Sequence, residues 1–318
     1  MNKKLLAVAI ASTFAAPLSA LADEGSVSIS GNLTASIVSA DTNGSGRATD
    51  VSPGGSDMSI AGWESLGNGL KAVFLLKSWV NVTGNPGGGS GSGLLFGNNK
   101  DAYLGLSGSF GTVALGAHGQ PYKTATGGLE LFGDTIGDAR GSVTNGQGAF
   151  HSGIGDALIW FLPNMSGFSG HLQWGAENGV DGGANPWGAQ VNYSNGPLYA
   201  TYAHANNDAG VSKRTGNKVG VGYSFGDTTV NGMVERTKLD GSKGITAYSL
   251  GLAQKFGANT AKIQYARNNF GDDQSLWAIG LDHAMSKRTK LFALYADGDK
   301  MGAGGFDNGI EVGIGHSF

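Results

Sequence analysis

The sequence contains no cysteine, which excludes a disulfide framework, a cysteine-based zinc or iron–sulfur site and a thiol nucleophile. Charged residues make up only 14% of its 318 residues, whereas they make up about 25% of ordinary soluble domains. The formal net charge of −3 is evenly spread. Nucleic-acid binding needs a basic face, so we expect no nucleic-acid partner. We also expect no cofactor.

Long apolar runs are lacking after the first 22 residues. Lys3 and Lys4 precede an apolar run at 5–16, and Ala20-Leu21-Ala22 forms a small-x-small cleavage site. This pattern is typical of a secretory signal peptide, and the run is shorter than the roughly 20 apolar residues of a transmembrane helix. We therefore expect residues 1–22 to be a signal peptide, cleaved near Ala22, and 23–318 to form the mature domain.

Glycine is abundant, at 57 residues, and the mature chain alternates polar with apolar or small side chains. At 27–37, for example, Val27, Ile29 and Ile37 alternate with Ser28 and Ser36. Period-two alternation indicates strands with one polar face, and their length of about ten residues suits a tilted membrane-spanning strand. We predict sixteen strands, near 27–38, 57–65, 69–82, 99–107, 111–118, 153–162, 168–178, 187–194, 197–206, 216–225, 228–237, 245–255, 259–268, 274–284, 289–297 and 309–318.

The links between these segments alternate in length. Short turns such as Asn195-Gly196 and Gly226-Asp227 separate long links, of which the third, 119–152, is the longest. An even number of strands with alternating long and short links is the pattern of an outer-membrane barrel. In hydrocarbon only a closed barrel pairs every backbone group of a sheet. We therefore predict an all-β fold, a transmembrane antiparallel 16-stranded β-barrel. Aromatic residues beside the short turns, including Phe110, Tyr199 and Phe225, are expected to form an interfacial girdle.

Several motifs also resemble the Gram-negative general porins. Residues 64–74 (ESLGNGLKAVF) are similar to the second hairpin of that family, and 102–113, 193–198 and 284–289 resemble later family segments in the same order. The C-terminal His316-Ser317-Phe318 fits the family's terminal aromatic signature. The resemblance implies a homotrimer of barrels in the outer membrane, each with a pore for passive diffusion of ions and small hydrophilic solutes. It also implies that the barrel-assembly machinery reads Phe318.

In that family the third long loop folds into the lumen, where its acids face basic residues on the wall. The resemblance therefore makes the constriction candidates here the charged residues of 119–152, which are Lys123, Glu130, Asp134, Asp138 and Arg140. The wall candidates are Asp57, Lys71, Lys77, His118, Glu235 and Lys262. Three basic residues common in the family are missing, since Asp57 and Ala61 stand in place of two of them, and residues 115–118 read LGAH where the family has LGRQ. We expect a weak cation preference, or little selectivity.

Other functions remain as alternatives. A sugar- or oligosaccharide-selective porin needs aromatic residues along the lumen, and a surface adhesin needs a plugged barrel. An outer-membrane hydrolase is disfavoured, because the six histidines form no H-x-x-x-H or H-E-x-x-H spacing and no G-x-S-x-G motif occurs. The glycine-rich segment 84–93 is a poor latch onto a neighbouring subunit. We expect outer-membrane lipid and lipopolysaccharide as the surroundings of the barrel. Asp272 and Asp273 are expected to be solvated charges of an external loop, with Ca²⁺ binding as the alternative.

Overall fold

The computed structural model describes residues 25–83, 99–146, 150–177, 184–207, 213–301 and 305–318. The predicted signal peptide and the glycine-rich segment at 84–93 lie outside these residues, so both stay predictions. No helix in the described part of the chain is long and apolar enough to cross a membrane.

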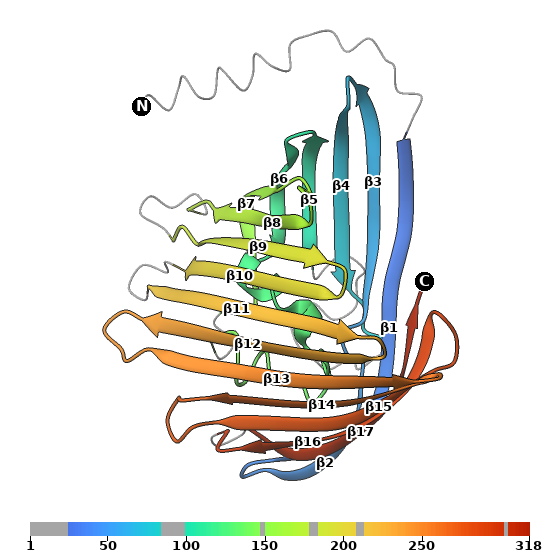
Figure 1. Cartoon of the computed structure of the whole chain (residues 1–318), viewed down its shortest axis with the longest axis vertical. Coiled ribbons are helices and arrows are strands. Elements are labelled where there is room, and N and C mark those ends of the chain that lie inside the picture. The colour runs from blue at the N-terminus through green and yellow to red at the C-terminus, as the bar shows by residue number, and fades with distance from the viewer. Residues whose placement is uncertain (1–24, 84–98, 147–149, 178–183, 208–212, 302–304) are drawn as a thin grey trace.

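All strands belong to one antiparallel sheet that closes into a 16-stranded barrel (Figure 1). The predicted fold class is therefore confirmed. Closure comes from the pairing of the first strand with the last, in which Ala35 lies opposite Ile314. The strands are β1 (Gly25–Thr42), β2 (Gly46–Ser52), β3 (Asp57–Gly67), β4 (Leu70–Trp79), β5 (Asn99–Gly108), β6 (Gly111–Gly119), β7 (Gly153–Phe161), β8 (Phe168–Gly175), β9 (Trp187–Asn195), β10 (Leu198–Asn207), β11 (Arg214–Phe225), β12 (Thr228–Leu239), β13 (Ile245–Phe256), β14 (Asn259–Asn268), β15 (Ser275–Ala284), β16 (Thr289–Asp299) and β17 (Phe306–Ser317).

The first long link differs from the prediction, because strand β2 occupies much of 39–56. Both β2 and β3 pair with β1, with Ser52 opposite Ser36 and Asp57 opposite Asn32. They act as one bulged strand with an extra residue in the break, as in other β-bulges. The seventeen labelled strands therefore make a barrel of sixteen. The Ser56 hydroxyl fills the break by accepting the Thr34 N–H at 2.8 Å and donating to the Thr34 carbonyl at 3.1 Å.

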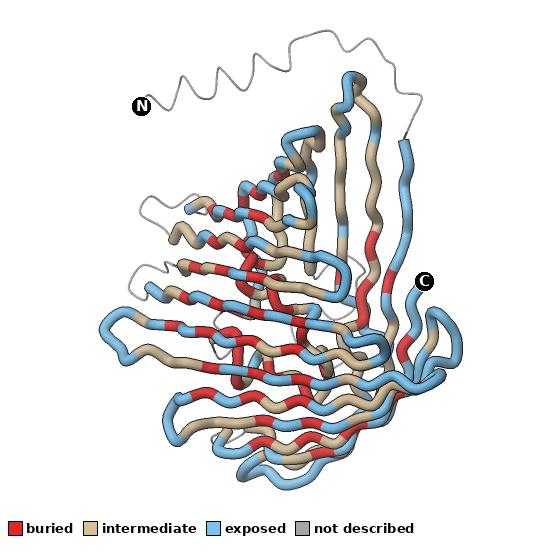
Figure 2. The backbone as a smooth tube through the Cα atoms, viewed as in Figure 1, coloured by how far each residue is buried: buried red, intermediate tan, exposed pale blue. Residues whose placement is uncertain are grey.

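The two faces of the sheet differ as the alternation predicts. Outward side chains are apolar and exposed, as Val27 and Leu115 show at 67% and 66%. Inward side chains are often polar and buried, and Figure 2 shows buried and exposed residues alternating along many strands. Since the outward face would meet lipid, this exposed apolar band suits a membrane barrel.

Aromatic residues recur at the end of the barrel with short turns. Phe110, Phe225 and Phe256 are exposed there, and two of the turns place Gly196 and Gly226 in the left-handed region that glycine tolerates. Tyr199 is an exception to the predicted girdle, because its hydroxyl donates to the Ala125 carbonyl of the third loop at 2.7 Å. The loop draws this ring away from the interface.

Candidate functional site: the pore constriction

The third long loop, 120–152, packs against the inner wall of the barrel. It contains a short helix, α2 (Pro121–Thr124), and a 3₁₀ turn, η1 (Gly127–Leu129). Its apolar side chains form two buried clusters with wall residues, one around Tyr122 and Phe150 and one around Phe132 and Val143. The predicted inward fold of this loop is therefore present in the structure.

Small residues on the wall make room for the loop. A Cβ atom on Gly220 would lie 2.6 Å from Leu129 Cδ1, and one on Gly280 would lie 2.8 Å from Phe132 Cε1. Ala203 and Ala205 on β10 pack near Tyr122 in the same way. Much of the glycine and alanine on β10–β16 thus serves the packing of the loop.

A buried ion pair anchors both ends of the loop. Lys218 on β11 lies 3.4 Å from Glu235 on β12, and their side chains are 0% and 1% exposed. Lys218 also donates to Asn145 and, at 3.3 Å, to Thr126. The Glu235 Oε1 atom accepts the Gly146 N–H at 2.8 Å. Glu235, which we predicted to be a pore-wall residue, thus faces inward but contacts the loop.

The tip of the loop is held by two further wall residues. Glu311 on β17 accepts the Ile136 N–H at 2.9 Å and the Ser36 hydroxyl at 2.7 Å. Gln264 on β14 accepts the Leu131 N–H at 2.9 Å and donates to Glu130. Glu130 is therefore directed to the wall. Its burial and the nearby Asp138 carboxylate raise the pKa of Glu130 to about 7.

The first charged group of the wall is the Asp57 cluster, made of Asp57, Lys77 and Lys100. The Asp57 Oδ2 atom lies 3.1 Å from Lys77 Nζ and 2.9 Å from Lys100 Nζ. Two lysines share one carboxylate, so the cluster carries one net positive charge. Sequence reasoning missed Lys100, because a register irregularity between β4 and β5 at this point brings it to the lumen against strict alternation.

The second charged group of the wall is the Asp282 cluster, made of Lys262, Asp282 and Lys290. The Asp282 carboxylate lies 2.9 Å from Lys262 Nζ and 3.0 Å from Lys290 Nζ. This cluster also carries one net positive charge. Asp282 on β15 and Lys290 on β16 were missed because both strands have apolar residues on both faces, which hides the alternation. On β15 Leu276 is buried and Ile279 is exposed, and on β16 Phe292 is buried and Leu291 is exposed.

The loop carries an opposing group, the Arg140 cluster, made of Asp134, Asp138 and Arg140. Arg140 Nε lies 2.9 Å from Asp138 Oδ1, and Nη2 lies 3.2 Å from Asp134 Oδ1. The hydrogen bond and charge of Arg140 outweigh burial and lower the pKa of Asp138. Asp134 is the exposed member, at 47%.

Lys123, the other cation of the loop, is outside this cluster. Burial and the neighbouring charges of Lys100 and Arg140 lower the pKa of Lys123.

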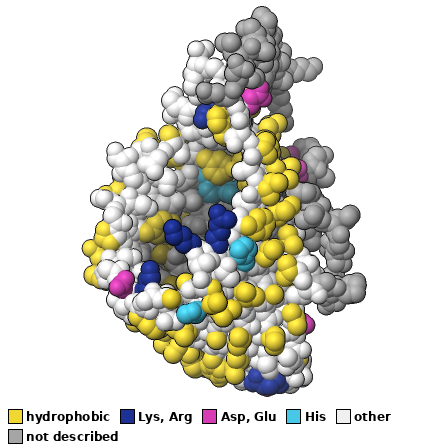
Figure 3. Space-filling model, turned by 90° about the vertical axis from the view of Figure 1, so that its right-hand side faces the viewer, with side chains coloured by type: hydrophobic (Ala, Val, Ile, Leu, Met, Phe, Trp, Pro, Cys, Tyr) yellow, Lys and Arg dark blue, Asp and Glu magenta, His cyan; other side chains and the backbone are white. Residues whose placement is uncertain are grey.

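These groups meet around one cavity of about 240 Å³. It lies between the loop tip at 131–135 and the wall, and both wall clusters contribute to its lining, through Asp57 and Lys100 and through the three members of the Asp282 cluster. Asp134 lines it from the loop side. Figure 3 shows a hollow in which Lys, Arg and His side chains are visible. The arrangement places wall cations and a loop carboxylate on one aqueous passage.

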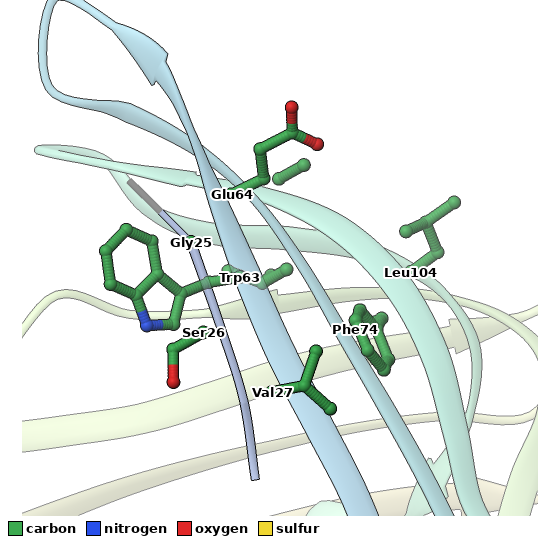
Figure 4. A pocket seen from close by; sticks show the side chains of 9 residues that line it. Gly25, Ser26, Val27, Trp63, Glu64, Phe74 and Leu104 are labelled. Atoms are coloured by element: carbon green, nitrogen blue, oxygen red, sulfur yellow. The ribbon is translucent and has the colours of Figure 1, made fainter. Parts of the chain in front are cut away.

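The remaining predicted residues lie apart from this cavity. Lys71, near the short-turn end of β4, lies 4.0 Å above the Trp63 ring. Figure 4 shows Trp63 and Ser26 on one side of the strands and Phe74 and Leu104 on the other, in a pocket of about 400 Å³. His118 Nδ1 lies 3.1 Å from Asp101 and near His171. No group of three acidic or histidine residues among the described ones has the arrangement of a metal site.

Phe318 closes the barrel at its end. Its backbone exchanges two hydrogen bonds of 3.1 Å with Gly31 of β1, and the residue is 40% exposed. The C-terminal residue is thus paired through its backbone, while its side chain remains accessible in part.

Comparisons with known proteins agree with this architecture. The model of a family described as Gram-negative porin matches residues 6–303. Outer membrane porin protein 32 of Delftia acidovorans is 28% identical and is covered in full, as is this chain. Major outer membrane protein P.IB of Neisseria meningitidis serogroup B is 25% identical over 91% of each chain.

Solved structures show the same fold. An anion-selective porin from Comamonas acidovorans superposes with a TM-score of 0.78 at 24% identity, over 93% of this chain and 100% of that one. The trimer form of OmpT from Vibrio cholerae gives 0.72 at 13% identity, with the same coverage. A closed barrel with a loop folded into its lumen and a family match over nearly the whole length lead to one conclusion: this chain belongs to the Gram-negative porin family and forms a channel in the outer membrane.

Proposed function

We propose that the protein is a homotrimeric, non-enzymatic general diffusion porin with a weak preference for anions. The observation that supports it is the sharing of each wall carboxylate by two lysines around the constriction cavity. Counted with the Arg140 cluster, which carries one net negative charge, the constriction has one positive charge in excess. Lys123 adds another positive charge, and Glu130, whose pKa is raised to about 7, adds a negative charge when it is ionised.

This proposal replaces the sequence-based expectation of a weak cation preference or little selectivity. That expectation did not include Lys100 or Lys290, which contribute half of the lysines in the two wall clusters. Opposed charges across a narrow passage orient water and polar solutes, and a ring of cations favours anions. The preference is weak because the carboxylates of Asp57, Asp134 and Asp282 line the same cavity.

The test is the reversal potential of the purified protein in a planar bilayer under a potassium chloride gradient. We expect permeability to chloride to exceed that to potassium, and conductance steps to close in threes. Lys100→Gln and Lys290→Gln are each expected to reduce the chloride preference, and the double variant to abolish it. Lys287→Gln, in the turn at 285–288, is the matched control and should leave the potential unchanged.

Two outcomes would contradict the proposal. A cation-preferring wild type would mean that the loop carboxylates dominate the field. Folded protein that gives no conductance would remove the diffusion pore altogether and favour a plugged barrel.

A further inference from the structure

A second pocket, here called the mouth pocket, lies at the long-loop end of the barrel where β11, β12 and β13 meet the third loop. It has a volume of about 330 Å³, which falls in the size range of small-molecule sites. Apolar side chains form its body: Phe150 from the third loop, Leu239 and Ile245 from β12 and β13, and Phe270 from the link after β14.

The mouth pocket faces the lumen. Thr237, one of its lining residues, is buried on the inner face and pairs with Gly216 and Ile245. Phe150 is also buried, against the inward alanines of β10. Gly146, at the edge of the pocket, is the residue that Glu235 holds through its backbone N–H. An occupant would therefore contact a loop residue that the buried ion pair holds in place.

Three cationic residues line this apolar pocket, but Lys238 follows the inward-facing Thr237 on β12, so its side chain lies on the opposite face of the strand. Arg214, Lys238 and Lys243 are exposed, and none of them forms an ion pair with a carboxylate among the described residues. Asp240 and Asp272 lie on the neighbouring links but do not line the pocket. The site thus combines positive charge with apolar walls.

We propose that the mouth pocket binds organic anions with an aromatic body, of the aromatic carboxylate class. The carboxylate would pair with Arg214 and Lys243, since guanidinium and carboxylate form charge-assisted hydrogen bonds. The ring would contact Phe270 and Leu239, since aromatic rings gain from offset or edge contacts. Chloride and acetate have no ring, so they would gain only the pairing with the cations. The proposal rests on the proposed channel, because it places a binding site at the channel entrance.

Equilibrium dialysis of labelled 1-naphthoate against the detergent-solubilised protein tests this directly. We expect saturable binding to the wild type that acetate does not displace at equal concentration. In the Arg214→Gln/Lys243→Gln variant, affinity should fall by about tenfold, which is the size of one charge-assisted hydrogen bond. Phe270→Ala should weaken it by about fivefold through loss of the ring contact.

Lys300→Gln is the matched control, because it removes a positive charge from the same end of the barrel outside the pocket. It should bind 1-naphthoate as the wild type does. Equal loss in this control, or displacement by acetate, would show a general electrostatic effect and overturn the proposal, as would absence of saturable binding. Conductance in potassium chloride is recorded separately, so a silent channel refutes the proposed function whereas a conducting protein without naphthoate binding refutes only this site.

Discussion

The inner wall of the barrel has two unlike sides. On β10–β16 the residues that face the third loop are mostly small or apolar, such as Gly220, Ala278 and Leu294, and they are covered by it. On β3–β5 the inward residues Asp57, Lys77 and Lys100 remain at the lumen, and neither apolar cluster of the loop includes a described residue of these strands. The Asp57 cluster therefore lies where the loop does not pack, whereas the Asp282 cluster lies on β14–β16, beside the loop tip.

This contrast shows how a barrel with a hollow centre obtains a hydrophobic core. A membrane barrel turns its apolar face to lipid, so its lumen has few apolar partners of its own. Here the third loop supplies Tyr122, Phe132 and Phe150 as the apolar partners of one side of the wall. The constriction is thus a consequence of core packing as well as of charge.

The largest loss of stability is expected when the buried ion pair of the covered side, Lys218 with Glu235, is broken. Lys218→Met leaves Glu235 buried without a counter-charge, which costs about 3–5 kcal/mol in comparable pairs. We expect a correspondingly lower free energy of unfolding, measured by urea titration in detergent. The double variant Lys218→Met/Glu235→Gln should recover most of the loss, because no uncompensated charge then remains.

Lys255→Met is the control for this series, since Lys255 is exposed on β13. It should change the unfolding free energy by less than about 0.5 kcal/mol, as is usual for surface positions. Single and double variants of equal stability would show that the pair does not anchor the loop through its charges.

A smaller effect is expected when a side chain is added to a wall glycine that packs against the third loop. In Gly220→Val the new side chain would meet Leu129, Thr126 and Thr201, all within 3.1 Å of the added Cβ. Overpacking of this kind costs about 1–3 kcal/mol, and the loop can relieve it only by moving toward the lumen. We expect lower single-channel conductance and greater current noise. Gly155→Val, whose Cβ meets nothing within 4 Å, should conduct as the wild type.

The same contrast explains what could be predicted from the sequence. Strands with a lipid-facing apolar side and a polar lumen side, such as β1, alternate clearly and were located within a few residues. The long and short links likewise fixed the direction of each strand. The inward fold of the loop followed from the family resemblance and from the length of 119–152, and its path in the structure agrees.

The composition of the charged clusters could not be predicted in full, for three physical reasons. Lys100 lies at a register irregularity, which changes the face of a side chain without a signal in the alternation. Lys290 and Asp282 lie on strands whose inward face is apolar because the loop covers it, so period two disappears there. Pairings within the loop, such as Asp138 with Arg140, depend on its folded path.

Glu130 on the loop should make both stability and chloride preference depend on pH. The pKa of Glu130 is raised to about 7, mainly by burial, so between its ordinary value near 4.5 and this value the folded state binds more protons than the unfolded state. This contribution makes stability fall as pH rises through that window. Below about pH 7 the loop also loses a negative charge, and chloride preference should rise. Glu130→Gln should remove both dependences, whereas persistence of both in this variant would assign them to another group.

The smallest effect is expected at Lys71, which faces the lumen of the uncovered side but lies six residues from Lys77 along β4. Six residues of strand span about 20 Å, and at 0.1 M salt charges are screened beyond about 10 Å. Lys71→Gln should therefore leave the reversal potential unchanged and cost only the exposed contact with Trp63, about 0.5–1 kcal/mol. A shift as large as that of Lys100→Gln would mean that selectivity is distributed along the whole uncovered wall and not set at the loop tip.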